Sequence, residues 1–207
     1  MFPTTRNLPA TRPNENPSVG LRKPPRSQCA DRAEKPSSSP QRDASGVDTV
    51  EFLGHPGGVI EHSIALRRDL ATAIRHHRPE LVVTLNHEDT WFGMNWNSPD
   101  HRNAGRAVLD AIGDAGNKWI FPELAEQGIE PWRGVRYVAI SGASNPTHAV
   151  AIESGLERSI RSLEAHARYL EALGGPLADA RTFLTANAEA AAERFGGRLA
   201  AAFQVMS

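Results

Sequence analysis

Hydrophobic and polar positions along residues 47–207 predict an alternation of strands and helices. Short apolar runs bounded by turn residues predict strands at 50–53, 81–85, 135–140, 149–152 and 201–206. Apolar residues that recur every three or four positions predict helices at 66–77, 99–112, 156–173 and 180–195. Strands that alternate with helices of about 10–15 residues are typical of α/β proteins. The pattern therefore predicts a Rossmann-like fold, with a mostly parallel sheet and helices on both of its faces.

Residues 1–46 differ in composition, and we expect them to form a disordered Pro/Ser-rich tail before a domain at 47–207. The segment holds eight of the 15 prolines and only ten hydrophobic residues. So little apolar surface cannot offset the entropy lost on ordering. Its eight basic and four acidic residues are dispersed among prolines, and Phe2 is its one aromatic residue. This pattern does not favour a nucleic-acid-binding arm.

The composition of the whole chain excludes several classes of protein. The 23 Lys and Arg residues against 24 Asp and Glu residues give a net charge of −1, which favours neither nucleic acid nor a membrane surface as partner. The single cysteine, Cys29, excludes an intramolecular disulfide and a cysteine-based zinc cage. No apolar run approaches the roughly 18 residues of a membrane span, and no apolar leader follows the N-terminus. We therefore expect a cytoplasmic protein, and the sequence gives no indication of its oligomeric state.

Polar side chains follow directly after the predicted strand at 81–85. Asn86, His87, Glu88 and Asp89 come first, and a loop containing Trp91 and Trp96 continues from them. The carboxyl end of a strand is where an open α/β sheet binds its ligands, so Asn86, Glu88 and Trp91 are candidates for substrate binding. An Asx-rich turn with aromatic residues covering the sheet edge explains the same pattern equally well.

His101 is a candidate metal ligand near the start of a helix. Ser98 is predicted to be the N-cap and Pro99 the first helical residue, which places His101 in the first turn. The positive end of the helix dipole disfavours imidazolium, and neutral imidazole is the form that binds a metal. Asp100 is a candidate acid beside it. Without further information, a histidine at this position is more often a surface or capping residue.

Other histidines and one glycine-rich turn are weaker candidates for a functional site. His148 precedes the strand at 149–152 and either reaches the crevice or faces solvent. His76 and His77 end a helix, where the dipole stabilises cations, and His166 lies between inner-face positions of the helix at 156–173. The turn from Gly54 to Gly58 lacks the Gly-x-Gly-x-x-Gly pattern of dinucleotide-binding proteins, so an NAD-binding module is disfavoured.

Four stretches together resemble the LmbE-like, PIG-L-type zinc N-deacetylases, over about residues 47–206. These stretches are Val50–Gly54, Leu66–Leu70, Arg78–Thr84 and Pro99–Ala107. The segment Pro99-Asp100-His101 before Arg102 is the most specific of them. The resemblance implies a Rossmann-like fold and hydrolysis of the acetamide of an N-acetylglucosamine-type sugar or glycoconjugate. It also implies a bound zinc ion, for which His101 matches the last ligand.

The chain departs from this family pattern at two places. Ser98 stands where the family has a histidine that assists the developing oxyanion, and His87 and His148 are the candidates to replace it. Upstream, the family's first strand and its Ala-His-Pro-Asp-Asp-Glu segment are missing, since residues 1–46 contain no histidine and the chain contains no Asp-Asp pair. Two zinc ligands and the general base are therefore unmatched.

The sequence thus predicts a zinc-dependent N-deacetylase domain that is incomplete at its N-terminal side and impaired in activity. Its candidate catalytic residues are Asp100, His87, His148 and Ser98, and its partner is a small N-acetylated amino sugar or glycoconjugate. The alternative is a catalytically inactive sugar-binding descendant, or the product of a truncated or frameshifted gene.

Overall fold

The computed structural model describes residues 46–91 and 95–207, so the predicted tail lies outside the described residues except for Gly46. Described helices and strands follow in the order α2 (Ile64–His77), β1 (Leu81–Leu85), β2 (Thr90–Trp91), β3 (Asn95–Trp96), α3 (Pro99–Gly116), α4 (Pro122–Glu126), β4 (Tyr137–Ser141), β5 (His148–Ala151), α5 (Leu156–Glu164), α6 (Ala167–Leu173), the 3-10 helix η1 (Gly175–Ala178), α7 (Ala180–Arg194) and β6 (Ala200–Met206). None of these helices is long and apolar enough to cross a membrane.

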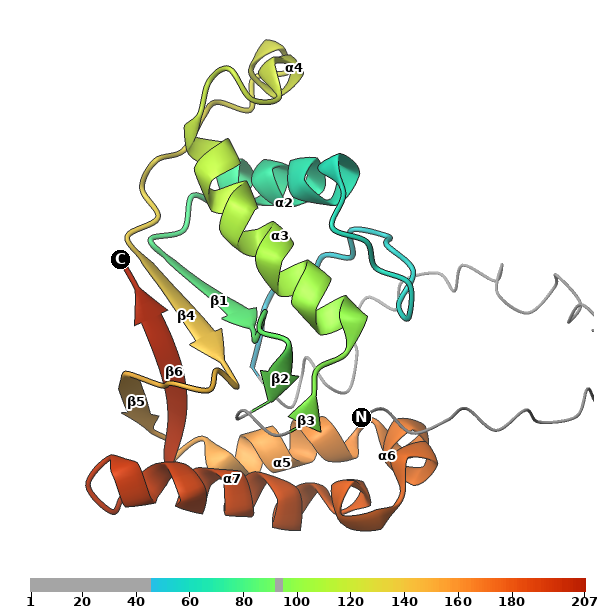
Figure 1. The fold of residues 1–207 in the computed structure, drawn as a ribbon, viewed down its shortest axis with the longest axis vertical. Coiled ribbons are helices and arrows are strands. Elements are labelled where there is room, and N and C mark those ends of the chain that lie inside the picture. The colour runs from blue at the N-terminus through green and yellow to red at the C-terminus, as the bar shows by residue number, and fades with distance from the viewer. Residues whose placement is uncertain (1–45, 92–94) are drawn as a thin grey trace, which may run out of the picture. The chain divides into compact units, whose positions relative to one another are not determined.

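A mixed four-stranded sheet in the order β1-β4-β6-β5 forms the centre of this unit (Figure 1). β1 and β4 run parallel, with Leu81 opposite Tyr137 and Leu85 opposite Ser141. β6 runs antiparallel to both of its neighbours, β4 and β5. The α/β, Rossmann-like class is confirmed, and the antiparallel strand is an addition that such sheets commonly carry near an edge. β2 and β3 form a separate small hairpin.

Helices α2 and α3 pack against each other beside β1 (Figure 1). Their contact is built from small and branched apolar side chains, namely Ala71, Ile74, Ala111 and Ala115. Alanines at such a contact let two helices approach closely. A bidentate ion pair joins the same helices, because Arg67 donates from Nε and Nη2 to the two carboxylate oxygens of the buried Asp114, at 2.9 and 2.8 Å. Its charge-assisted hydrogen bonds raise the pKa of Arg67.

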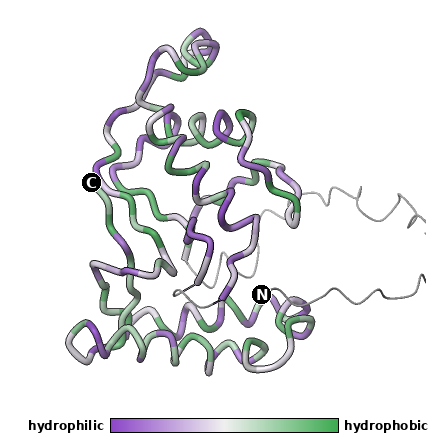
Figure 2. The backbone as a smooth tube through the Cα atoms, in the orientation of Figure 1, coloured by the Kyte–Doolittle hydropathy of each residue, from purple (hydrophilic) through white to green (hydrophobic). Residues whose placement is uncertain are grey.

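The hydrophobic pattern located most of the elements correctly. The strand at 81–85 and the helices that begin at 99 and 180 are where the sequence predicts them. Figure 2 shows hydrophobic positions running along the central strands, as expected for buried strands. β1 is an edge strand of the described sheet, and its residues Leu81, Val83 and Leu85 are 52%, 59% and 43% exposed. The exposed side chains of β1 are thus as apolar as those of a strand that lies covered inside a larger sheet.

Two predicted elements differ in the structure. The strand predicted at 50–53 is wrong, since this segment pairs with no described strand and Phe52 is 70% exposed. An apolar run becomes a strand only where a neighbour accepts its backbone hydrogen bonds. The helix predicted at 156–173 is broken into α5 and α6, because the N–H of His166 bonds to the carbonyl of Leu163 in a tighter turn. His166 is exposed at this break, as expected of a solvated residue.

The N-cap of α7 makes stability sensitive to acid. The carboxylate of Asp179 accepts the N–H of Thr182 at 3.0 Å and its hydroxyl at 2.8 Å, which lowers the pKa of Asp179. A lowered pKa means that the stabilisation is present above the unfolded-state pKa of about 4 and is lost as the pH falls through the folded-state pKa. We expect Asp179→Asn, which keeps a capping oxygen but does not titrate, to lose less unfolding free energy than the wild type between pH 5 and 3. Urea unfolding at each pH measures this.

The exposed Asp48 supplies the control, because Asp48→Asn removes the same charge from a segment outside any described helix or strand. This control should keep the pH dependence of the wild type. An unchanged pH dependence in Asp179→Asn would show that the cap contributes nothing to acid sensitivity.

Candidate functional site

A tight turn at the carboxyl end of β1 forms one wall of the candidate site. Asn86 is fully buried, its amide nitrogen donates to the carbonyl of Thr90 at 2.9 Å, and its amide oxygen accepts the N–H of Glu88 at 2.8 Å. The predicted Asx-rich turn is therefore present, and the side chain of Asn86 is used in forming it. Its neighbour Glu88 reaches the loop after β4, where its carboxylate accepts the N–H of Ser144 at 3.2 Å and also the Ser144 hydroxyl.

Asn97 joins this turn to His101. The amide nitrogen of Asn97 donates to the carbonyls of Asn86 and Glu88, at 2.9 and 3.0 Å. The amide oxygen then lies 3.3 Å from Nδ1 of His101. An amide oxygen only accepts, so this contact needs a proton on Nδ1, and in the neutral imidazole the lone pair is then on Nε2. This tautomer is the one in which a histidine offers Nε2 to a metal or to a proton.

Asn97 is a residue that the sequence reasoning missed. It stands four residues before His101, one turn of helix away, and directly before the N-cap Ser98. Its side chain is fully buried although it is polar, which marks a residue whose hydrogen bonds are needed. A buried asparagine cannot be recognised from spacing alone, but its place beside a cap and a candidate histidine was the available signal.

Ser98 and Asp100 both have hydrogen-bond partners that organise the backbone. The prediction that Ser98 caps the helix is confirmed, because its hydroxyl accepts the N–H of His101 at 3.2 Å. The carboxylate of Asp100 accepts the N–H groups of Gly58 and Ile60, the latter at 3.1 Å. Asp100 thus holds the turn around Gly58 against the start of α3.

Trp91 forms a second wall beside His101. Its ring stands edge-on to the imidazole, with the ring centroids 5.6 Å apart and the planes at 88°. On another side it lies against Gly142, whose φ of +72° and missing side chain leave room for the indole. A Cβ at that glycine would come within 2.0 Å of the Trp91 ring, so a larger residue there would displace Trp91. The indole is therefore held between the start of α3 and the loop after β4.

The remaining predicted residues lie at different distances from this cluster. His87 packs with its Cβ against Gly105 of α3, and its Nδ1 is buried with no hydrogen-bond partner among the described residues. His148 is exposed at the start of β5, with Nδ1 2.8 Å from the hydroxyl of Thr147. It shares a row of the sheet with Ser141, but β6 lies between them, so about 10 Å separates the two positions.

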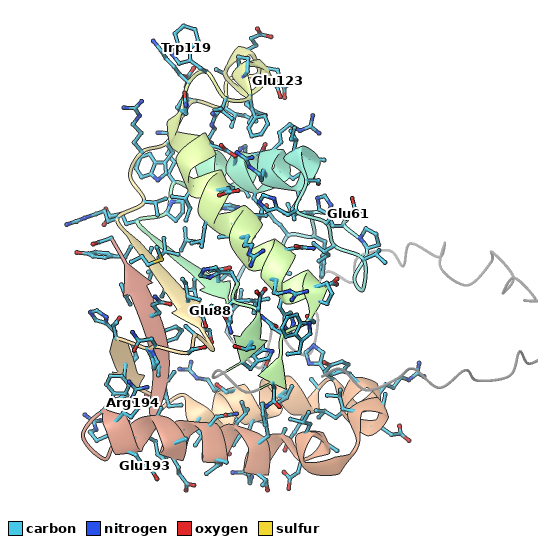
Figure 3. The ribbon with its side chains drawn as sticks, in the orientation of Figure 1. Glu61, Glu88, Trp119, Glu123, Glu193 and Arg194 are labelled. Carbon is cyan, nitrogen blue, oxygen red and sulfur yellow. The ribbon has the colours of Figure 1, made fainter. Side chains whose placement is uncertain are left out.

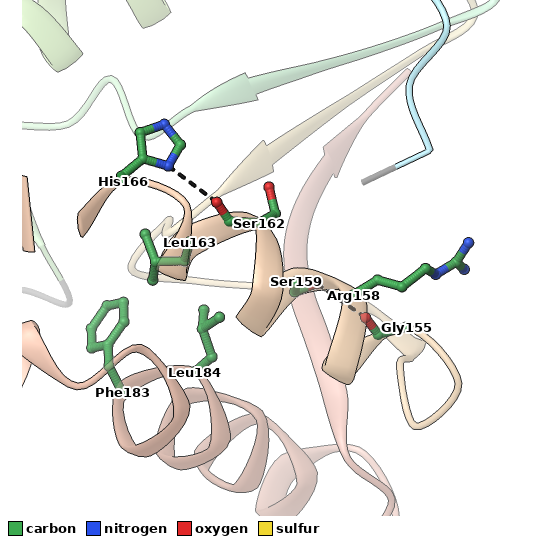
Figure 4. A pocket seen from close by; sticks show the side chains of 8 residues that line it. All are labelled: Gly155, Arg158, Ser159, Ser162, Leu163, His166, Phe183 and Leu184. Carbon is green, nitrogen blue, oxygen red and sulfur yellow. Dashed lines mark hydrogen bonds between the residues drawn. The ribbon is translucent and has the colours of Figure 1, made fainter. Parts of the chain in front are cut away.

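The structure thus brings together His101, Asn97, Ser98, Asp100 and the turn at residues 86–89. Glu88 and Trp91 border the same cluster (Figure 3 labels Glu88). His148 stands apart from it across the sheet. A separate open hollow of about 560 Å³ lies between α5 with the turn that follows it and α7, and it shares no residue with the cluster (Figure 4). Its lining is mixed, since Leu163, Phe183 and Leu184 are apolar whereas Arg158 and His166 are polar.

Zinc binding requires more donors than this cluster supplies. No three His, Cys, Asp or Glu side chains gather as a metal would require anywhere in residues 46–91 and 95–207. The carboxylate of Asp100 already accepts two backbone N–H groups. The described residues therefore hold no set of three donors that would make a complete zinc centre.

The fold and the cluster define an α/β protein of Rossmann-like class with a polar site at the carboxyl ends of its parallel strands. The sequence pattern of the PIG-L family, described as GlcNAc-PI de-N-acetylase, matches residues 28–112. Over this segment the chain is similar to the PIG-L, or LmbE-like, family, as its motifs indicated. The match begins upstream of residue 46, within the segment for which composition predicts a tail.

One curated protein and two solved structures are also similar to this chain. The diacetylchitobiose deacetylase of Thermococcus kodakarensis is 25% identical over 121 residues, which cover 58% of this chain and 43% of that protein. The N,N'-diacetylchitobiose deacetylase of Pyrococcus horikoshii has a TM-score of 0.63 and 20% identity, over 80% of this chain and 60% of that one. A conserved protein of Thermus thermophilus has a TM-score of 0.61 and 23% identity, over 79% and 68%. The chain thus spans less than half the length of the curated relative.

Proposed function

We propose that the chain recognises N-acetylated amino sugars of the N-acetylglucosamine type and that hydrolysis of their acetamide is the reaction for which its site is built. The orientation of His101 carries this proposal. Asn97 fixes the imidazole from behind through Nδ1, at the N-terminal turn of α3, so that Nε2 is the nitrogen presented to a ligand. The similarity to two diacetylchitobiose deacetylases supports the substrate class.

The residues around His101 suit a sugar. Trp91 offers an aromatic wall held in place by Gly142, and apolar faces of pyranose rings pack on such walls. Glu88 is the acceptor for hydroxyl groups of the sugar at the neighbouring wall, and Asn86 acts indirectly by fixing the turn that carries Glu88. His87, which packs against Gly105 of α3, keeps its candidate role toward the oxyanion, whereas His148 stands apart from the cluster across the sheet.

The described residues supply only part of the donor set for the zinc ion that the family resemblance implies. His101 is the ligand that the described residues would supply, and a catalytic zinc ordinarily has three protein ligands and a water. We therefore assign no catalytic step to a metal. We expect this polypeptide to bind zinc weakly and to show little or no deacetylase activity. Incomplete ligation also favours the second candidate function, a sugar-binding protein that no longer hydrolyses its ligand.

One set of measurements tests the proposal. The full chain is purified and its cooperative unfolding is confirmed, so that poor folding is not mistaken for poor catalysis. Zinc content is then measured by elemental analysis, and acetate release from N-acetylglucosamine and N,N'-diacetylchitobiose is assayed. We expect substoichiometric zinc, sugar binding and little acetate. His101→Ala should remove the remaining zinc and any turnover.

The exposed His76, in the last turn of α2, provides the control. His76→Ala should leave zinc content and acetate release unchanged. Stoichiometric zinc with turnover that depends on His101 would overturn the expectation of impaired activity and show that further ligands complete the site. Absence of both sugar binding and acetate release from a folded chain would overturn the proposed function itself.

A further inference from the structure

Residues 46–62 form an extended segment before α2, which we call the strap. The strap contains no described helix or strand and runs beside α2 and the start of α3 (Figure 1). Glu51 of the strap contacts His77 in the last turn of α2, and His55 contacts Asp69, eight residues earlier in that helix. Eight helical residues rise about 12 Å and four extended residues span about 13 Å. The strap therefore lies along α2 and runs antiparallel to it.

Three pairs of a histidine and a carboxylate join the strap to the two helices. They are His55 with Asp69 of α2 at 3.0 Å, His62 with Asp110 of α3 at 2.8 Å, and His77 of α2 with Glu51 of the strap at 3.2 Å, each measured from Nε2 to a carboxylate oxygen. All six side chains are partly open to water, with exposed fractions between 26% and 53%. Protons from the solvent therefore reach each pair.

A contact between histidine and carboxylate changes in strength with pH. A neutral imidazole can donate one hydrogen bond to the carboxylate, whereas an imidazolium adds a full positive charge to the same contact. Histidine ordinarily changes its charge between pH 8 and 5, where the carboxylates of Asp and Glu stay ionised. The three contacts are therefore stronger on the acid side of this range and weaker on its alkaline side.

Other charged groups also face these pairs, from the strap and from both helices. They are Glu61, Arg67, Arg68, His76 and Asp114. Arg68 lies 3.8 Å from the carboxylate of Asp69, and Arg67 lies 3.9 Å from that of Asp110, so in both cases the histidine is the nearer partner. Arg67 is bonded mainly to Asp114. The ring of His76 lies 6.3 Å from that of His77, and its charge opposes the third pair.

The strap is also tied to the start of α3, beside the candidate site. The carboxylate of Asp100 accepts the N–H groups of Gly58 and Ile60, and the amide nitrogen of Asn103 donates to the carbonyl of Ile60 at 2.7 Å. Asp100 directly precedes His101 in the chain. Separation of the strap from the helices would therefore release the carboxylate of Asp100 next to His101.

We propose that the strap is a proton-sensitive clasp. It closes on α2 and α3 when His55, His62 and His77 are charged, and it opens more often as the pH rises and these histidines become neutral. Opening frees the carboxylate of Asp100, so the surroundings of His101 change with pH through the strap. The clasp does not depend on the proposed function, because its contacts involve neither a sugar nor a metal.

Hydrogen exchange of the full chain, followed by NMR, tests the clasp. The N–H groups of Gly58 and Ile60 are bonded to Asp100 while the strap is closed, so their protection factors, corrected for intrinsic exchange at each pH, measure the closed population. We expect about tenfold higher protection at pH 5.5 than at pH 8, since each of three exposed ion pairs contributes a factor of about two. The amide of Ile74, a buried residue of α2, should be much better protected at both pH values.

Replacement of the three histidines by glutamine removes the charge and keeps a hydrogen-bond donor. In the triple variant of His55→Gln, His62→Gln and His77→Gln, the strap amides should be equally protected at both pH values. His166→Gln changes an exposed histidine outside the three pairs and should keep the pH dependence of the wild type. If the triple variant does not unfold cooperatively in urea, the three single variants replace it, and each should reduce the effect of pH about twofold.

Three results would overturn the clasp. The first is equal protection of the strap amides at the two pH values in the wild type, and the second is a pH effect that persists without the three histidines. The third is protection of the strap amides equal to that of Ile74, which would show that the strap opens only when the whole domain unfolds. Sugar binding enters none of these measurements, so the clasp and the proposed function can fail separately.

Discussion

Replacement of Arg75 by Met is expected to lower the free energy of unfolding by at least about 3 kcal/mol, the largest effect we predict for one side chain. Arg75 is 2% exposed and lies on α2. Its guanidinium donates to five backbone carbonyls at and beyond the C-terminus of α3, with donor–acceptor distances from 2.9 to 3.4 Å. These carbonyls belong to Asp114, Ala115, Asn117, Ile120 and Phe121.

The size of this effect follows from what the carbonyls lose. The last carbonyls of a helix lack the usual partner four residues further on, and the bonds from Arg75 to those of Asp114 and Ala115 are buried in the interior. Burial lowers the pKa of Arg75, which shows the cost of holding the charge there, and nearby Glu123 and Asp114 offset part of this cost. Methionine fills similar volume but donates no hydrogen bond. The carbonyl of Ile120 would lose the donor that Arg75 supplies, and the other four carbonyls would each keep one backbone N–H and lose their second donor in the interior.

Urea unfolding of two variants measures the difference. Arg133→Ala is the matched control, since Arg133 also donates to a carbonyl near the same helix end, that of Gly116 at 2.7 Å, but is exposed. We expect it to cost less than about 1 kcal/mol, because water can replace the lost donor. Similar losses of unfolding free energy for the two variants would show that burial of the carbonyls bonded to Arg75 is not the cause of the effect.

Arg75 also illustrates which features the sequence could predict. Basic residues near the end of α2 suggest a helix-dipole interaction, and this accounts for His76 and His77. Arg75, immediately before them, faces inward to another helix. Nothing in its spacing distinguishes it, because its partners lie about forty residues away along the chain and are backbone groups.

Local patterns predicted local structure well. Ser98 followed by Pro99 predicted the start of α3, and the cap hydrogen bond to His101 is present. Features that depend on distant partners were predicted less well. The antiparallel direction of β6 depends on how the chain returns from α7, and the fate of residues 50–53 depends on whether a strand lies beside them.

In the candidate site too, local features could be predicted from the sequence and contacts with distant residues could not. The sequence identified His101 and the turn at 86–89 because a helix start and a strand end are recognisable locally. It assigned Asp100 to the histidine beside it, whereas in the structure its carboxylate binds backbone groups of Gly58 and Ile60, some forty residues earlier. Asn97, which links the turn to His101, acts through three partners that no periodicity reveals.

At Gly105, α3 lies close against the carboxyl end of β1, and we expect Gly105→Ala to destabilise the protein by about 1–3 kcal/mol. A Cβ at this position would stand 2.9 Å from the carbonyl oxygen of Leu85 and 2.9 Å from Cβ of His87. Both obstacles are backbone or close to it and cannot rotate away. The helix would have to move from the strand end, and the Asn97–His101 contact at its first turn would move with it.

Gly113, two turns further along α3, provides the opposite outcome as a control. It is exposed, and a Cβ there would meet nothing within 4 Å. Gly113→Ala should therefore stabilise the protein by about 0.5–1 kcal/mol, the ordinary difference in helix propensity. Chemical unfolding of both variants, together with the NMR signals of the His101 ring, measures the effect. Gly105→Ala should shift those signals and Gly113→Ala should not. Stabilisation by Gly105→Ala with unchanged His101 signals would show that α3 does not need this close approach, and that the position of His101 does not depend on it.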